Sequence, residues 1–421
     1  MASDSDPVHI DDLGSPSHPP HVEEMLRDAE KLPRPRLDVE SLCEEASQQT
    51  GLTDFGHEDF KERLDLYLGA LETQGGLSAL GRLSRHGEIV KFLSTRLRVE
   101  DCIARHPSIL EIQIARPIVI TGFPRTGTTH LHNSLAADPE LRSLPYWEAL
   151  EPVPVDETPD GGPDPRRARC AETLEWINSA MPHFPSMHEM TVDHAHEEID
   201  LLALDFSTMY LETPGPLYRW IDHYRASDQT PHYAYLKRVL QVLTFLRGGE
   251  RWVLKSPQHF EQLVPLASVF PDATLVITHR DPLPVVASYA TMMTYTARLQ
   301  QDRPDPIAYG RYVAERMDDL LSACMRDREL WPGERSLDIR FHEFTADQDA
   351  AVKSVYARAN QPLSGRSRSA IADYAKSHKQ GRHGRLRYQL SDFGLKADEL
   401  RERFRPYVER FGLREENPAS A

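Results

Sequence analysis

The stretch "RPIVITGFPRTGTTHLHNSL" (116–135) constrains the fold most, because a short β-rich run, a glycine-containing turn and a helix follow one another in it. Gly122 and Gly127 have the G-x-x-x-x-G spacing of a phosphate-binding P-loop. The lysine that reaches the β- and γ-phosphates in that pattern is replaced here by Thr128. We therefore expect an anion-binding loop whose ligand is not a nucleoside triphosphate.

The residue types in this loop suit a tetrahedral anion. The turn exposes backbone N–H groups at the positive end of a helix that is expected to begin near Thr128. Gly127 lets the backbone approach an anion closely, and Arg125 adds a guanidinium suited to phosphate. Hydroxyl donors are expected from Thr126, Thr128 and Thr129. The alternative is a tight strand-to-helix turn with an N-capping threonine and no ligand.

The rest of the chain predicts an α/β fold, with a P-loop-like parallel sheet flanked by helices. Apolar runs at 251–256, 273–280 and 335–344 alternate with helical stretches, which is typical of a parallel sheet covered on both faces. Three segments are predicted: a disordered tail over 1–35, a helical N-terminal region over 36–113, and an α/β domain over 114–415 in which 150–250 form a helical cap.

Composition limits the partners and the compartment. The net charge of −16 argues against a general role in binding nucleic acid or anionic membranes, so an anionic ligand needs a local basic pocket. No apolar run approaches the 18 residues of a membrane span, and the acidic, Ser- and Pro-rich N-terminus does not resemble a signal peptide. The four cysteines form no C-x-x-C pair. These features predict a cytoplasmic protein without disulfides or a thiolate zinc site.

A second anion site is predicted in "THRDPLPVVASY" (278–289). Arg280 ends a strand, Asp281 can cap the next helix, and Pro282 suits its first position. Ser288 follows Arg280 by eight residues, so the two could hold one further phosphate. The alternative is that Arg280 merely pairs with a carboxylate at the strand end.

The strand ends argue against a kinase. A P-loop kinase needs an aspartate that holds Mg²⁺ on a later strand, whereas "WVLKS" and "LVITHR" end in cations. Ligands of α/β proteins bind at the carboxyl edge of the sheet, and that edge is expected to carry Arg125, Lys255 and Arg280. Such a site suits a ligand with several phosphate-like groups and no metal.

Together these stretches resemble the sulfotransferases that use 3′-phosphoadenosine 5′-phosphosulfate (PAPS), over roughly residues 115–400. In that superfamily a loop like "PRTGTT" (124–129) holds the 5′-phosphosulfate, and an "R-D-P…S" segment like "RDPLPVVAS" (280–288) holds the 3′-phosphate. "WVLKSPQHF" (252–260) resembles the strand that carries a lysine and a catalytic histidine. "RYQLSDFGL" (387–395) resembles a C-terminal segment that covers the cofactor.

The resemblance implies transfer of a sulfuryl group from PAPS, in line and without a metal, to a hydroxyl or amine of a small-molecule, lipid or glycan acceptor. The residues expected to bind the donor are Arg125, Thr126, Gly127, Thr128, Thr129, Arg280, Ser288, Arg385, Arg387 and Tyr388. Arg125, Lys255 and the helix N-terminus are expected to stabilise the charge that the leaving bisphosphate gains.

The base that activates the acceptor is left open between three positions. The superfamily's histidine stands two residues after the lysine, where this chain has Pro257, so His259 is the first candidate. Glu148 is the second, because some members use a carboxylate in that region. The third is His196 or Glu197, in "DHAHEEIDLL".

Other readings remain for parts of the chain. His194 and Glu198 stand four residues apart, but they do not match H-E-x-x-H and lack a cysteine cluster, so no metal site is expected. Aromatic residues in the cap could line an apolar acceptor pocket or simply form core. The alternatives to the sulfotransferase are a P-loop nucleotide kinase in which Arg125 replaces the lysine, and a degenerate nucleotide-binding scaffold.

Overall fold

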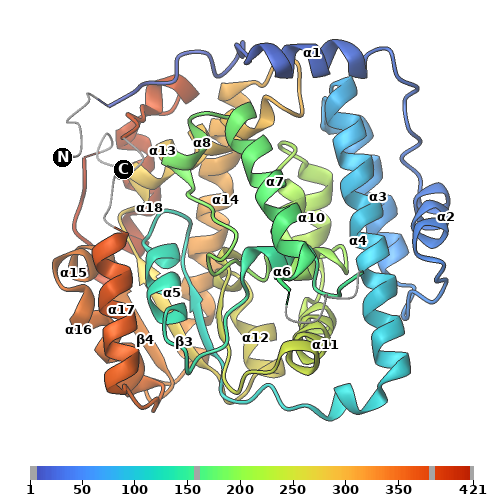
Figure 1. Ribbon diagram of the computed structural model, residues 1–421. Coiled ribbons are helices and arrows are strands. Elements are labelled where there is room, and N and C mark those ends of the chain that lie inside the picture. Colours follow the sequence, from blue (N-terminus) through green and yellow to red (C-terminus); the bar gives the residue numbers. More distant parts are fainter. Residues whose placement is uncertain (1–6, 156–161, 379–384, 418–421) are drawn as a thin grey trace.

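The computed structural model describes residues 7–155, 162–378 and 385–417. Within these ranges the strands form one sheet of four parallel strands in the order β2-β1-β3-β4 (Figure 1). The strands are β1 Ile118–Thr121, β2 Val253–Lys255, β3 Thr274–His279 and β4 Ser336–Arg340. The predicted fold class, a parallel sheet flanked by helices, is confirmed, and the bounds of each predicted strand lie within one to four residues of the observed ones.

Both faces of the sheet are covered, which explains why β1, β2 and β3 are buried at every position. Alternate residues of β1 enter different clusters: Ile118 and Ile120 pack toward α5, α15 and α16, whereas Val119 joins the large core on the other face. The helices along the sheet are α5 Thr128–Ala136, α12 Leu263–Val269, α13 Pro282–Ala297, α14 Pro306–Asp327, α15 Phe341–Ala346, α16 Gln348–Arg358, α17 Gly365–Ser377 and α18 Ala397–Phe411.

The N-terminal region is helical as predicted, with α2 Val39–Thr50, α3 Phe60–Gln74 and α4 Ala79–Arg105. The prediction of a disordered tail over 1–35 is wrong in the described part. Helix α1, Pro20–Ala29, crosses the top of the molecule in Figure 1 and buries Val22 completely. Ile10 and Leu13 are buried too, so three apolar side chains fix a segment whose Ser and Pro content indicated disorder.

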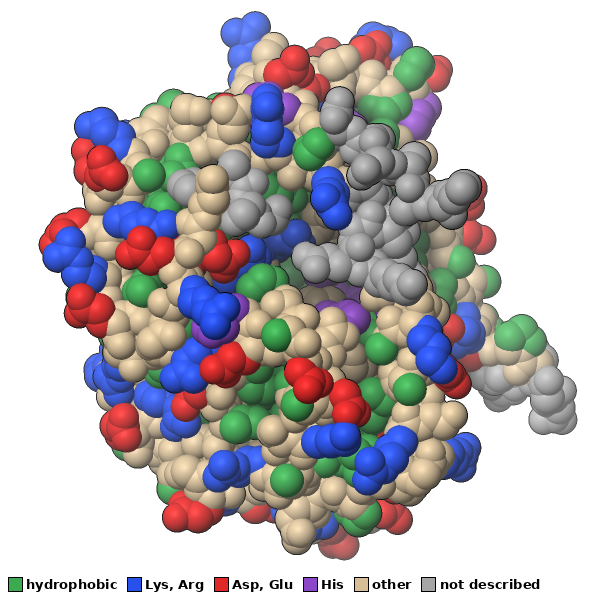
Figure 2. All heavy atoms as spheres, turned by 90° about the vertical axis from the view of Figure 1, so that its left-hand side faces the viewer, with side chains coloured by type: hydrophobic (Ala, Val, Ile, Leu, Met, Phe, Trp, Pro, Cys, Tyr) green, Lys and Arg blue, Asp and Glu red, His purple; other side chains and the backbone are tan. Residues whose placement is uncertain are grey.

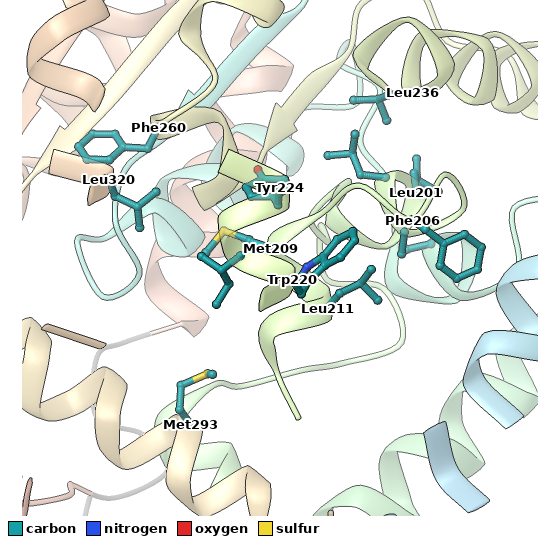
Figure 3. Packing of buried hydrophobic residues seen from close by; sticks show 14 of the residues in the cluster. Leu201, Phe206, Met209, Leu211, Trp220, Tyr224, Leu236, Phe260, Met293 and Leu320 are labelled. Atoms are coloured by element: carbon teal, nitrogen blue, oxygen red, sulfur yellow. The ribbon is translucent and has the colours of Figure 1, made fainter. Parts of the chain in front are cut away.

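The cap consists of α6 Tyr146–Leu150, α7 Pro165–Ala180, α8 Phe184–Met187, α9 Ile199–Ala203, α10 Tyr218–Ala226 and α11 Thr230–Arg247. Its buried side chains, such as Trp220 and Tyr224, belong to the same hydrophobic cluster as Phe260 and Leu320 of the α/β part (Figure 3). The cap is therefore continuous with the main core. In the described ranges no helix is both long and apolar enough to cross a bilayer.

Candidate active site

The loop between β1 and α5 has the tight geometry that its glycines predict. A side chain at Gly122 would collide with Thr278 of the neighbouring strand β3, so the close passage of the two backbones requires glycine. Gly127 is the N-cap of α5 and has a left-handed φ of 91°. Arg125 also has a positive φ, 71°, which is uncommon for a residue with a side chain and marks a constrained loop.

The start of α5 presents free backbone donors. The amide of Leu131 donates to the carbonyl of Gly127 (3.1 Å), so the amides of Thr128, Thr129 and His130 precede the first intrahelical hydrogen bond. No side chain of the described residues caps this end. The helix begins at the predicted residue, and its N-terminus can hold an anion.

The three threonines of the loop differ in what their hydroxyls contact. The buried Thr126 donates to the carbonyl of Phe123 (2.6 Å) and is 2.7 Å from the Thr278 hydroxyl, so its side chain holds the loop. Thr128 and Thr129 line a cavity of about 680 Å³. Of the three predicted hydroxyl donors, only these two are placed to meet a ligand.

A lysine and a glutamate meet beside this helix N-terminus. Lys255, at the end of β2, forms an ion pair with Glu197 and also donates to the hydroxyl of Thr129 (3.3 Å). Glu197 lines the same cavity as Thr128 and Thr129. A carboxylate, a cation and an anion-binding helix end therefore lie at one place. Figure 2 shows a face of the molecule hollowed near its middle, where histidine side chains are visible.

His259, the first candidate for the base, does not line the cavity and is fully buried. Its Nε2 is 2.5 Å from Glu198 Oε1, and its Nδ1 is 2.7 Å from the hydroxyl of Tyr233. Burial opposes the ionised form of Glu198, but the hydrogen bond to His259 holds the pKa of this carboxyl below its ordinary value. Glu198 also accepts from the Lys255 amide (3.0 Å). The geometry thus gives His259 a supporting position and argues against it as the base.

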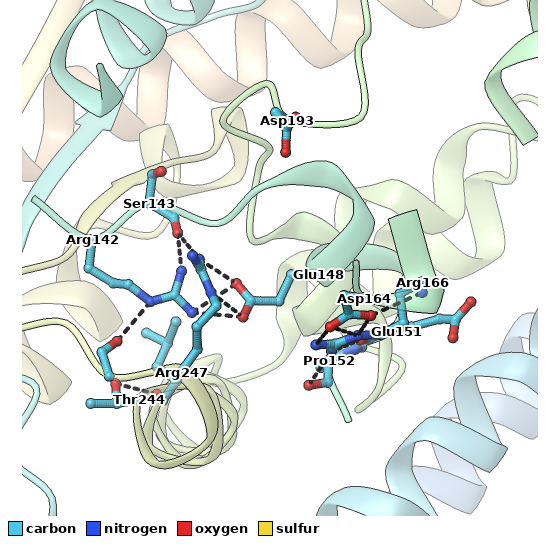
Figure 4. Close-up of polar contacts among 12 residues, drawn as sticks. Arg142, Ser143, Glu148, Glu151, Pro152, Asp164, Arg166, Asp193, Thr244 and Arg247 are labelled. Atoms are coloured by element: carbon cyan, nitrogen blue, oxygen red, sulfur yellow. Dashed lines mark hydrogen bonds and ion pairs between the residues drawn. The ribbon is translucent and has the colours of Figure 1, made fainter. Parts of the chain in front are cut away.

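Glu148, the second candidate, is buried and forms ion pairs with two arginines. It accepts from Arg142 at 2.8 Å with both oxygens and from Arg247 at 2.9 and 3.0 Å (Figure 4). Its side chain is 1% exposed and lies outside the cavity lining. The geometry therefore indicates that Glu148 fixes Arg142 and Arg247, and it argues against a role as the base.

The third candidate region lines the cavity with His196 and Glu197. His196 is bonded to Asp200 (2.6 Å) through Nε2 and to His194 (3.1 Å) through Nδ1, so both its ring nitrogens have partners. Burial lowers the pKa of His194 to about 3 and that of the cavity-lining His188 well below its ordinary value. Within the described ranges, no group of three or more potential ligands is arranged to hold a metal ion.

Arg280 holds an anion supplied by the chain itself. Its Nε and Nη2 donate to the carboxylate of Glu416 at 2.7–3.2 Å, and its Nη1 donates to the carbonyl of Arg125 (2.9 Å). Asp281 caps α13 through the amide of Leu283 (3.1 Å), with proline at the first position, as predicted. Ser288 is buried on the same helix.

The C-terminal residues predicted to cover the donor are placed differently from one another. The backbones of Arg385 and Arg387 pair with Val8, and both side chains are exposed outside the 680 Å³ cavity. Tyr388 is buried and lies near Arg125, whose pKa is lowered by burial and also, to a smaller extent, by Arg280. Residues 379–384 of the predicted basic loop lie outside the described residues.

Sequence reasoning missed two features of this site. Glu416 stands 136 residues from Arg280, and no local pattern connects them. Helix α4 lines the far end of the cavity with Leu80, Ser84 and Glu88. Their four-residue spacing in the sequence indicates that these three residues share one helix face.

Comparisons with known proteins agree with this fold. A family model described as "Sulfotransferase family" matches residues 117–365. Sulfotransferase STF9 from Mycobacterium avium is 28% identical, with a TM-score of 0.82, over 91% of this chain and 98% of its own. Sulfotransferase STF1 from Mycobacterium tuberculosis H37Rv is 27% identical, with a TM-score of 0.77, over 88% of this chain and 99% of its own. No curated protein sequence matches the chain.

Proposed function

Because the chain belongs to the sulfotransferase family, we propose that it transfers the sulfuryl group of PAPS to a hydroxyl of an apolar acceptor without a metal ion. The observation that carries this proposal is the meeting of Lys255, Glu197 and the N-terminus of α5 at one end of the 680 Å³ cavity. The cavity provides room for an acceptor beside the groups that would hold the donor.

The residues present fit the donor's anionic groups. The amides at the start of α5, with Thr128 and Thr129, would hold the 5′-phosphosulfate, and Lys255 would meet the phosphate oxygen that gains charge. Arg280 already binds a carboxylate, which stands in for the 3′-phosphate. Donor binding would therefore displace Glu416 from Arg280. A direct role for Arg385, Arg387 and Ser288 stays a prediction.

Glu197 is our choice for the base. Transfer breaks the bond from sulfur to the phosphate oxygen and forms one to the acceptor oxygen, whose proton must leave. In this structure Glu197 is paired with Lys255. When Lys255 turns toward the phosphate, the Glu197 carboxylate becomes free to accept that proton. His259 and Glu198 would act as positioning residues, because Glu198 holds the backbone of Lys255.

Ligand affinity tests this proposal against the kinase alternative. Titration calorimetry with adenosine 3′,5′-bisphosphate and with ATP, each with Mg²⁺ and with a chelator, separates the two. We expect bisphosphate to bind equally well in both conditions and ATP to bind more weakly. A preference for ATP with Mg²⁺ contradicts the proposal. A scaffold would bind bisphosphate yet give no sulfated product with any acceptor in a mass-spectrometric screen.

A further inference from the structure

The far end of the cavity is built by helix α4, which lies outside the residues that the family model matches. Leu80, Ser84 and Glu88 follow one another at four-residue intervals on the face that lines the cavity, together with Arg85. This end of the cavity is therefore built by the N-terminal region. Like Asp200 elsewhere in the lining, it carries buried charge.

Arg85 is 6% exposed, and its guanidinium lies beside the hydroxyl of Tyr67 as well as the carboxylate of Glu88. Its Nη1 is 2.6 Å from Glu88 Oε2, and Glu88 Oε1 accepts from the hydroxyl of Tyr210 (2.6 Å). The ion pair is thus neutral as a whole. The Nε of Arg85, however, has no hydrogen-bond partner among the described residues, and a buried donor left unpaired costs about 1–3 kcal/mol. The arrangement is suited to a ligand oxygen that accepts from this N–H.

An unused acceptor lies on the neighbouring segment. Gln300 lines the cavity, and its buried Oε1 has no hydrogen-bond partner in the described part of the chain. Ser78 donates its amide to the carbonyl of Gln300 (2.8 Å), and a side chain at Gly81 would collide with that carbonyl. The start of α4 is therefore fixed against residue 300, and Arg85 follows Gly81 by about one helical turn.

Part of the remaining cavity wall is apolar and adaptable, although His196, Asp200 and Tyr210 also line the cavity. Its lining includes five methionines, Met181, Met190, Met209, Met292 and Met293; two of them, Met209 and Met293, appear in Figure 3. Methionine side chains are flexible and polarisable, so such a wall accepts apolar bodies of different shape. Selectivity must then come from the polar groups of the lining.

We propose, resting on the function proposed above, that the acceptor is an elongated apolar molecule with an oxygen at each end. One end carries the hydroxyl that meets Glu197, and the other carries a neutral hydroxyl or carbonyl oxygen that accepts from Arg85 Nε. A hydroxyl fits better than a carbonyl because it can also donate to Gln300. A carboxylate fits worse, because it adds an unbalanced charge to the neutral Arg85–Glu88 pair.

The test uses phenols with straight para chains of increasing length, each chain ending in a methyl, ketone, hydroxyl or carboxylate group. Binding is measured by calorimetry with bisphosphate present, and transfer is measured separately with PAPS. At one chain length we expect the hydroxyl-ended phenol to bind at least about tenfold more tightly than the methyl-ended one, with the ketone between them. The carboxylate should give no gain over methyl.

Variants of α4 identify the group responsible. Arg85→Lys keeps the charge and loses the Nε donor, so it should abolish the preference while the methyl-ended phenol binds as before. Arg82→Lys is the matched control on the same helix, since Arg82 does not line the cavity. The double variant with Arg85→Met and Glu88→Met replaces the buried pair with apolar groups, which proteins often tolerate.

The outcomes separate this inference from the proposed function. The inference is overturned if phenols with all four chain ends bind equally at every length, if the carboxylate-ended phenol is preferred, or if no phenol binds. A preference that survives both Arg85 variants overturns it too. If the preference is found but bisphosphate does not bind and no phenol is sulfated, the proposed function fails and the acceptor class stands. If methyl-ended phenols are sulfated without any preference for oxygen, only the inference fails.

Discussion

Glu197 and Glu198 are neighbours in the sequence, but they lie in opposite environments. Glu197 lines the cavity and pairs with the amino group of Lys255. Glu198 is completely buried, where it contacts His259 and the backbone amide of the same lysine. One glutamate thus meets the side chain of Lys255 from the cavity, and the other fixes its backbone from the core.

This difference shows how a buried ion pair can position an ion pair that borders the cavity. A buried pair cannot exchange a proton with a ligand that never reaches it, but it holds its neighbours in one geometry. The pair of Glu198 and His259 fixes the end of β2, and from there Lys255 reaches Thr129. We therefore assign a positioning role to the buried pair of Glu198 and His259, and a chemical role to the pair of Glu197 and Lys255.

The largest expected effect comes from breaking the buried pair of Glu198 and His259. Glu198→Ala leaves His259 and the Lys255 amide without their partner in the core, so the free energy of unfolding should fall by about 3–5 kcal/mol. Urea unfolding followed by circular dichroism measures it. Glu197→Gln is the control, with a smaller loss expected because this side chain borders the cavity. Equal losses would show that the two glutamates are not in different environments.

Removing the charge of Lys255 tests its ion pair with Glu197. Lys255→Met should lower kcat by about 10²–10³-fold, because the leaving phosphate loses a preorganised cation. Steady-state turnover with PAPS measures this change, and thermal melting checks that the fold is kept. If kcat falls less than about threefold, the leaving group is stabilised elsewhere.

The second anion site can be tested by affinity alone. Arg280→Ala should weaken binding of adenosine 3′,5′-bisphosphate by about one to two orders of magnitude, as expected for a hydrogen-bonded charge worth about 1.5–3 kcal/mol. Calorimetry gives the Kd. The exposed Arg385 and Arg387 are the comparison, and their alanine variants should change the Kd by less than about threefold. A larger effect there would support the predicted C-terminal contacts with the donor.

The smallest effect concerns the carboxylate that now occupies Arg280. Glu416→Gln should tighten bisphosphate binding several-fold, because the ligand no longer displaces an ion pair, whose exposed form contributes only about 0.2–1 kcal/mol. Glu415→Gln is the matched control, since Glu415 lies 3.7 Å from Arg401 and does not contact Arg280. Unchanged affinity in Glu416→Gln would place the 3′-phosphate away from this arginine.

Local patterns predicted the parts of the site that depend on neighbours in sequence. Helix α5 begins at the expected Thr128, with Gly127 as its N-cap, and Asp281 caps α13 with Pro282 behind it. These features follow from backbone conformation and capping, which a few residues determine. The fold class followed from apolar runs that alternate with helical stretches. The carboxyl edge of the sheet did gather Lys255 and Arg280 near the loop.

Contacts between distant segments could not be read from the sequence. His259 seemed a base because it follows Lys255, but Tyr233 and Glu198 close around it after folding. Glu148 was a candidate because some sulfotransferases use a carboxylate in that region, whereas Arg247, 99 residues later, pairs with it. Exposure to the cavity, which decides whether a titratable group can react, is a property of tertiary packing alone.

One comparison of variants tests the central claim that Glu197 is the base. Glu197→Gln and His259→Gln are assayed for sulfated product with labelled PAPS and a phenol acceptor, at a temperature where both are folded. We expect Glu197→Gln to lower turnover by at least about 10²-fold while the Kd of the bisphosphate changes little, and His259→Gln to keep most of the turnover. Loss of turnover in His259→Gln with full activity in Glu197→Gln would contradict it.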